Sequence, residues 1–206
     1  RLAPAQQWQH AHHLTRQLTI VGRLDEAWTW AARCAALAVS PHQHVAAAIT
    51  SRFAISATSA PSERVAALAG ATRHIKRLQP EQLGQYLLLL ALDQYEAGDH
   101  PLAQSIIDRL RALGPELTPT RRWHSMMFQA LLLTDRGETS EAHGFREAAH
   151  NYGITCGLVE AENAYTAPAF VDLWLRRSTA ILRSEVDGGV LNPSNSVLAR
   201  AAAANT

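Results

Sequence analysis

The chain has few of the features that usually mark a secreted protein. Its 206 residues include only two cysteines, Cys34 and Cys156, and 6% aromatic residues. The two cysteines lie far apart in the sequence, among small apolar residues, which indicates buried free thiols rather than a disulfide framework. Free thiols are typical of a reducing compartment. We therefore expect a cytoplasmic protein.

Long apolar runs and an excess of charge are also missing. No apolar run reaches the length of a membrane span and no secretory signal opens the chain, so we expect no membrane association. The 19 Lys and Arg residues balance 18 Asp and Glu, for a net charge of +1. The pairs Arg121-Arg122 and Arg176-Arg177 are interpreted as solvated helix faces. We expect no direct nucleic-acid binding by this fragment, and a chain that begins at Arg1 suggests a longer parent protein.

Sequence motifs of catalysis and metal binding are absent as well. There is no phosphate-binding Gly-x-x-x-x-Gly-Lys loop, dinucleotide fingerprint, Cys-x-x-Cys pair or Gly-x-Ser-x-Gly elbow. Of ten histidines, only His10 and His13 share a helical face in the first helix, and no acid lies beside them. Glu160 and Glu162 would point away from each other on a helix. We expect no enzyme activity, no cofactor and no bound metal.

The chain does contain a repeated spacing of turn residues. Gly22, Ala60, Gly98 and Gly137 follow one another at intervals of 38, 38 and 39 residues. Apolar residues return at offset five as Ala27, Val65, Ala103 and Ala142, and at offset eight as Trp30, Leu68, Ile106 and Phe145. Further matches lie at offsets 12 and 15, so the steps of three and four form one helical stripe. Such a period predicts a stacked array of helical repeats.

Helix formers fill the intervals between glycine and proline breakers, and this predicts an all-α protein. The predicted helices run over about residues 4–21, 24–39, 41–58, 60–78, 80–97, 98–113, 119–136 and 137–152. Gly153 is expected to cap the last of them. A divergent fifth pair, over 157–165 and 169–186, and a weak terminal helix over 197–204 follow. We expect a repeat domain over 1–187 and a tail over 188–206.

The turn between paired helices resembles the tetratricopeptide repeat (TPR). Residues 97–103 read Ala-Gly-Asp-His-Pro-Leu-Ala and are followed by Leu-Gly-Pro at 113–115. The Gly-to-Ala spacing returns at 22–27 and 137–142. The resemblance covers about residues 7–153. The period exceeds the usual repeat of about 34 residues, and the aromatic and Leu-Gly signatures of the first helix are missing or displaced. Longer repeats of this kind resemble the sensor arrays of large bacterial transcriptional regulators.

The resemblance implies a right-handed solenoid of antiparallel helical hairpins, in which the first helix of each pair lines a concave groove. The groove positions it implies are His12, Arg16, Thr50, Gln85, Tyr95, Glu96, His124, Met127 and Asp135. This mixture of polar and apolar side chains suits an extended peptide or a helix, with Arg16 as the best anchor for a carboxylate. Trp8 and Trp123 each precede a turn glycine by 14 residues and are interpreted as packing across a hairpin mouth, with a groove rim as the alternative.

The sequence therefore favours a non-catalytic interaction module that binds a protein or peptide. We expect it to be the sensor or scaffold part of a bacterial regulatory protein. A regulatory domain that binds a small-molecule effector, with Arg16, Tyr95 and His124 converging, is the alternative. An enzyme with a scattered site is a third reading, and the sequence is also compatible with a homo-oligomer.

Overall fold

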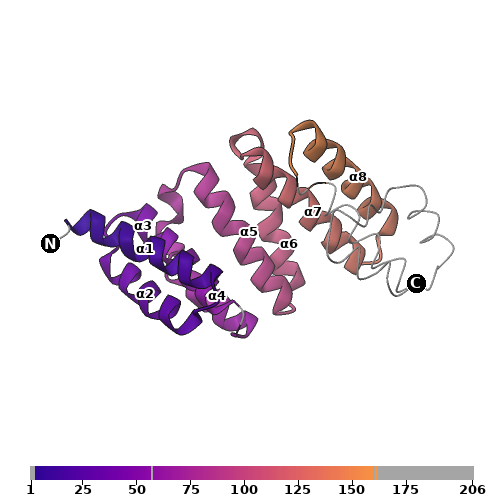
Figure 1. Cartoon of the computed structure of the whole chain (residues 1–206). Helices are drawn as coiled ribbons and strands as arrows, with labels where there is room; N and C mark the ends of the chain where they lie inside the picture. Colours follow the sequence, from indigo (N-terminus) through magenta and orange to yellow (C-terminus); the bar gives the residue numbers. More distant parts are fainter. Residues whose placement is uncertain (1–2, 57, 160, 162–206) are drawn as a thin grey trace. The chain divides into compact units, whose positions relative to one another are not determined.

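The protein is described by a computed structural model covering residues 3–56, 58–159 and 161 (Figure 1). All elements within these residues are helical, and no strand occurs among them. The chain divides into two compact units, Arg1–Ser125 and Met126–Thr206. The predicted helices over 169–186 and 197–204, and the predicted boundary between residues 187 and 188, lie outside the described residues.

The described part of the chain contains eight α-helices and two 3-10 helices. They are α1 (Pro4–Ile20), α2 (Leu24–Leu37), α3 (Pro41–Ile55), α4 (Pro61–Ala69), η1 (Thr72–Arg77), α5 (Pro80–Glu96), α6 (His100–Ala112), η2 (Gly114–Glu116), α7 (Pro119–Asp135) and α8 (Thr139–Thr155). The all-α prediction is confirmed, and most helix ends lie within three residues of the predicted ones. In the residues described, no helix combines the length and hydrophobicity needed to span a membrane.

Three of the four repeated turn positions share one backbone structure. Gly22, Gly98 and Gly137 have φ angles of 78°, 86° and 78°, a region that other residues enter only with strain. After each glycine the next amide donates to a carbonyl five residues earlier, as in Arg23 N to Leu18 O at 2.9 Å. This is a Schellman ending, and it reverses the chain directly into the next helix. The glycine period is therefore a period of helix caps.

The second hairpin differs from the others at its turn. Ala60 precedes Pro61, which disfavours the helical region for that residue, and its ψ angle is 153°. Its second helix also breaks where a continuous helix over 60–78 was predicted. The α4 helix ends at Ala69, and the segment η1 follows after Gly70. Here the Tyr86 hydroxyl of α5 donates to the Leu68 carbonyl at 3.3 Å, which provides a partner for a terminal carbonyl of α4.

Two predictions near the end of the described chain are wrong. Gly153 does not cap α8: it is a buried residue inside that helix, and its carbonyl accepts from Leu158 N at 2.9 Å. The capping residue is Gly157, with a φ angle of 69°. Cys34 is buried as predicted, but Cys156 is exposed. Cys156 immediately follows the last turn of α8, where the chain leaves the helix.

Successive hairpins stack inside the first unit. The pairs α1–α2 and α5–α6 lie side by side in Figure 1, and α2 also packs on α3, and α4 on α5. The first helices of the hairpins meet as well, since α3 contacts both α1 and α5. Small residues allow this close approach: Ala27 and Ala103, at offset five from their turn glycines, are fully buried. Trp30 packs against both apolar clusters that join α1 and α2 to α3.

The second unit begins within α7 and continues through α8. The offset-five residue Ala142 and the offset-12 residue Ala149 on α8 are both fully buried. Leu132 and Leu133 on α7 are buried as well. The repeat pattern read from the first unit therefore also describes which face of α8 is covered.

A buried ion network joins α3, α4 and α5 in the first unit. Asp93 is fully buried, and Arg52 donates to both of its oxygens, at 2.9 and 2.5 Å. Arg64 donates to Asp93 at 2.9 Å, to the Ser59 carbonyl at 3.0 Å, and to Glu96. Arg52, Arg64 and Asp93 are thus buried together, and the exposed Glu96, with its side chain 43% accessible, supplies the second carboxylate at the surface. Sequence reasoning missed this network, although an aspartate inside the apolar run of α5 was its visible signal.

Candidate functional site

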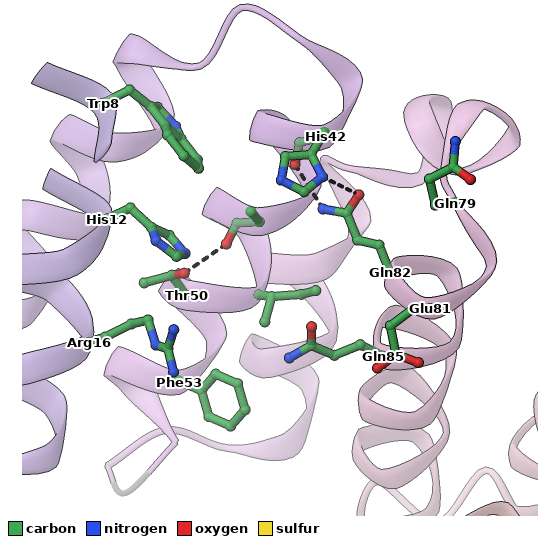
Figure 2. A pocket seen from close by; sticks show the side chains of 12 residues that line it. Trp8, His12, Arg16, His42, Thr50, Phe53, Gln79, Glu81, Gln82 and Gln85 are labelled. Atoms are coloured by element: carbon green, nitrogen blue, oxygen red, sulfur yellow. Dashed lines mark hydrogen bonds between the residues drawn. The ribbon is translucent and has the colours of Figure 1, made fainter. Parts of the chain in front are cut away.

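A groove of about 670 Å³ crosses the first helices of three successive hairpins in the first unit. Its lining comes from α1 (Trp8, His12, Arg16), α3 (His42, Ala46, Ile49, Thr50, Phe53) and the start of α5 with the residue before it (Gln79, Glu81, Gln82, Gln85), as Figure 2 shows. Lining residues recur three or four positions apart on each helix, so each helix presents one face. The side chains are aromatic, aliphatic, amide and basic, with one hydroxyl and a single carboxylate.

The α1 wall carries the positive charge of the groove. Trp8 and His12 are one turn apart and stack, with ring centroids 5.0 Å apart and planes 12° from parallel. Arg16 follows one turn later and is exposed. Among the residues that the structure describes, no carboxylate pairs with Arg16. A guanidinium without a counter-ion, on the wall of a concave site, is suited to an anionic ligand group.

His12 is held in its neutral form near neutral pH. Burial lowers the pKa of the imidazole, and the positive charges of Arg16, His42 and His13 lower it further. A neutral imidazole can donate one hydrogen bond and accept another. An anion bound to Arg16 would oppose these effects, because it favours the protonated ring.

The opposite wall is built mainly from amides. The His42 Nδ1–H donates to Gln82 Oε1 at 2.7 Å, and the Gln82 amide donates to the His42 carbonyl at 2.9 Å, which links α3 to α5. The Glu81 carboxylate accepts hydrogen bonds from two residues that do not line the groove. The donors are Arg121 Nε at 3.2 Å and the Thr118 amide at 3.4 Å. The single carboxylate of the lining is therefore already paired.

The α3 floor is apolar because its one hydroxyl is satisfied locally. Thr50 donates to the Ala46 carbonyl at 2.7 Å and so presents its methyl group. Ile49 and Phe53 complete this surface, and Phe53 is 38% exposed. The Arg52 guanidinium lies 5.3 Å from the Phe53 ring centre. The buried ion network thus touches a residue that lines the groove.

The groove contains four of the nine residues proposed from the sequence, namely His12, Arg16, Thr50 and Gln85. The other five lie elsewhere. Tyr95 stacks on His100 with ring centroids 4.9 Å apart, Glu96 pairs with Arg64, and His124 Nδ1 donates to the Thr120 carbonyl at 2.8 Å. Met127 and Asp135 are on the part of α7 that belongs to the second unit.

Other lining residues were not proposed from the sequence. His42, Gln79 and Gln82 lie at the start of a helix or just before it, and Phe53 lies near the end of α3. Trp8 was noted for its repeat position: it is buried, as is its counterpart Trp123, and it lines the groove. In the described residues, no group of three or more His, Cys, Asp and Glu side chains is placed to hold a metal ion.

Comparisons with known proteins identify the fold. No protein-family model matches the sequence, and no curated protein matches it. A crystal structure from Podosopora anserina, described as a candidate kinesin light chain with nearly identical TPR-like repeats, superposes with a TM-score of 0.64. The match is 19% identical and covers 91% of this chain and 96% of that chain. The protein thus has a TPR-like helical repeat fold, as predicted. Folds of this kind are typical of protein-interaction modules.

Proposed function

We propose that the groove across α1, α3 and α5 binds an extended peptide segment of a partner protein without converting it chemically. The observation that carries this proposal is Arg16, which pairs with no carboxylate of the described residues, beside an apolar floor and an amide wall. Peptide-binding sites combine such components: a charge for orientation, pockets for side chains, and polar groups for the backbone. The lining offers no nucleophile–base pair that would support an enzymatic reaction.

Each wall of the groove has a distinct task in this proposal. Arg16 holds a carboxylate of the peptide, and His12 adds a hydrogen bond or, once protonated, a second charge. Ile49 and Phe53 contact an apolar side chain. The side-chain amides of Gln79 and Gln85 donate to and accept from the peptide backbone, since an extended segment leaves its own N–H and C=O groups unpaired.

The test is selection of random peptides by display on the full chain, followed by fluorescence anisotropy of labelled winners. Arg16→Gln should weaken the selected peptides about tenfold or more, the range of a charge-assisted hydrogen bond. Arg109→Gln, on the exposed face of α6, removes an equal charge away from the groove and should leave affinity unchanged. Failure to select any peptide, or equal losses in both variants, would refute peptide binding in this groove.

A small-molecule effector is the second candidate, because the groove volume of about 670 Å³ falls in the range of small-ligand sites. The sequence predicted that Arg16, Tyr95 and His124 would converge on the effector. Neither Tyr95 nor His124 lines the groove, so only Arg16 of these three can contact an effector bound there. Thermal unfolding with a panel of carboxylated metabolites separates the two candidates. A metabolite that raises the midpoint in the native chain, but not in Arg16→Gln, would favour the effector.

We further propose that this module is the sensor or scaffold part of a bacterial regulatory protein in the cytoplasm. The long repeat period and the Gly-to-Ala turns support this proposal through their similarity to the sensor arrays of large bacterial regulators. Sequencing the parent gene tests it. A DNA-binding, nucleotide-hydrolysing or signalling domain in the same reading frame is the expected result, and a secretion signal would contradict it.

A further inference from the structure

The segment η1, between α4 and α5, concentrates positive charge on the surface. Four of its six residues, Arg73, His74, Lys76 and Arg77, are basic, and we call these four the basic ridge. The stretch holds more basic residues than either arginine pair singled out from the sequence, and it stands out in a chain of net charge +1. None of its residues lines the groove.

The 3-10 conformation orders these charges. Residues three apart eclipse each other in a 3-10 helix, so η1 presents three straight rows. Ile75 is 9% exposed and anchors one row in the core. Arg73 with Lys76 and His74 with Arg77 form the other two rows, and both arginines and the lysine are exposed. Partners in a row are separated by about 6 Å along the axis, since the rise is about 2 Å per residue.

The basic ridge lacks acidic partners. Within the described residues, no carboxylate forms an ion pair with Arg73, Lys76 or Arg77. Arg73 Nε donates to His74 Nε2 at 3.0 Å, and the His74 ring stacks on His44 of α3 with centroids 4.4 Å apart. Partial burial, then the positive charges of His44, Arg73 and Arg77, lower the pKa of His74. Arg73 and Arg77 therefore disfavour the protonated form of the His74 ring.

We propose that the basic ridge docks an acidic, extended segment of a partner protein. Same-side residues of an extended chain are about 6.6 Å apart, which matches the spacing of about 6 Å within each row. Acidic residues at alternate positions would therefore meet Arg73 and Lys76 in register. Nucleic acid fits less well, because three permanent charges fall short of the 6–10 phosphate contacts typical of such interfaces. This surface is separate from the groove, and the proposal does not depend on the groove's ligand.

The probe is a fluorescein-labelled octapeptide of alternating Glu and Ser, titrated with the full chain at low ionic strength and followed by anisotropy. Arg73→Gln/Lys76→Gln should weaken binding about tenfold and reduce the salt dependence. The control Arg109→Gln/Arg146→Gln removes two charges from α6 and α8 and should bind like the unaltered chain. Circular dichroism checks that both variants keep their helices. An alternating Gln–Ser peptide should not bind.

Three results would overturn the proposal. The first is no binding of the Glu–Ser peptide at low salt. The second is an equal loss of affinity in the ridge and control variants, which would mean that net charge alone attracts the peptide. The third is tighter binding of a single-stranded DNA oligomer that is lost in the ridge variant, because the ridge would then be a nucleic-acid surface. Arg16→Gln should not alter peptide binding here, so the outcome is independent of the groove test.

Discussion

The first and second hairpins solve the same packing problem with different interactions. In the first, Gly22 reverses the chain, Ala27 and Ala31 are fully buried, and Trp30 fills the space between two apolar clusters. In the second, the turn glycine is replaced by an extended Ala60 before a proline, and the buried residue of the first turn is Arg64 rather than an alanine. Repeats of equal length can thus bury an apolar residue in one hairpin and a charged residue in the next.

The difference has a consequence for the groove. Arg64 and Arg52 are held against Asp93 of α5, so the second hairpin is tied to the third by directional hydrogen bonds. The free energy of apolar packing is roughly proportional to the buried area and has no directional preference, so it tolerates small shifts of the helices. A buried bidentate ion pair, in contrast, is favourable in one geometry only. The polar core and the hydrogen bonds between His42 and Gln82 therefore hold the α3 floor against the α5 wall, whereas the α1 wall is held by apolar packing.

The largest expected effect comes from breaking the polar core. Asp93→Ala leaves Arg52 and Arg64 buried without their shared carboxylate, and should lower the free energy of unfolding by about 3–5 kcal/mol. Urea denaturation measures it. Glu26→Gln breaks an exposed ion pair, in which the side chain of Arg23 is 61% exposed and that of Glu26 is 52% exposed. This substitution should cost under about 1 kcal/mol. Similar costs for both variants would mean that the network is solvated.

The apolar core of the first hairpin is the next target. Trp30→Ala removes a side chain shared by two clusters and should cost about 3 kcal/mol, the lower end of the range for such truncations because Trp30 is only partly buried. Trp28→Ala, on the same helix but 50% exposed, should cost much less. Thermal or urea unfolding compares the two. Equal midpoints would show that the repeat register of α2 is misassigned.

Substitutions at the turns should have a smaller effect on stability, and this effect comes from backbone conformation alone. Gly22→Ala forces a methyl group into a φ angle of 78° with no neighbouring atom within 4 Å, so its cost of about 1–2 kcal/mol is conformational alone. Ala60→Gly, at the equivalent position of the second hairpin, should cost less than about 1 kcal/mol, because the backbone there suits any residue. Urea midpoints decide between them, and the opposite order would contradict the cap assignment.

The smallest effect is a dependence on pH through His12. Its folded-state pKa lies below the ordinary 6.5, so the unfolded chain takes up the proton first. Stability that is present above about pH 6.5 is therefore lost as the pH falls through that value toward the folded pKa. His12→Gln should lose less stability between about pH 7.5 and 5.5 than the native chain, as measured by urea midpoints. The exposed His10→Gln, at a position that is not among the groups lowering the pKa of His12, is the control, and identical pH profiles in the two variants would contradict the assignment.

The fold was largely predictable because its signals are local. A glycine that caps a helix and apolar residues at offsets of three and four act within one hairpin, and they located all eight described α-helices. The groove was predictable only in part. Arg16 and Gln85 were found by their offset from a turn glycine, but His42 and Gln79 line the groove by virtue of how α3 and α5 meet. The offset rule also proposed Glu96, whose partner is Arg64, a residue from another helix.

From its sequence alone, this protein is a series of helical hairpins with glycine caps, since caps and helical stripes depend on neighbours a few residues away. Only the tertiary structure decided which polar residues are buried and which are available. Asp93 lies 41 residues after Arg52 and 29 after Arg64, and the three become an ion network only when α3, α4 and α5 pack together. Arg16, Arg73 and Lys76 look like any surface cations in the sequence, and they become candidate contact points because that packing brings them no carboxylate from the part of the chain that the structure describes.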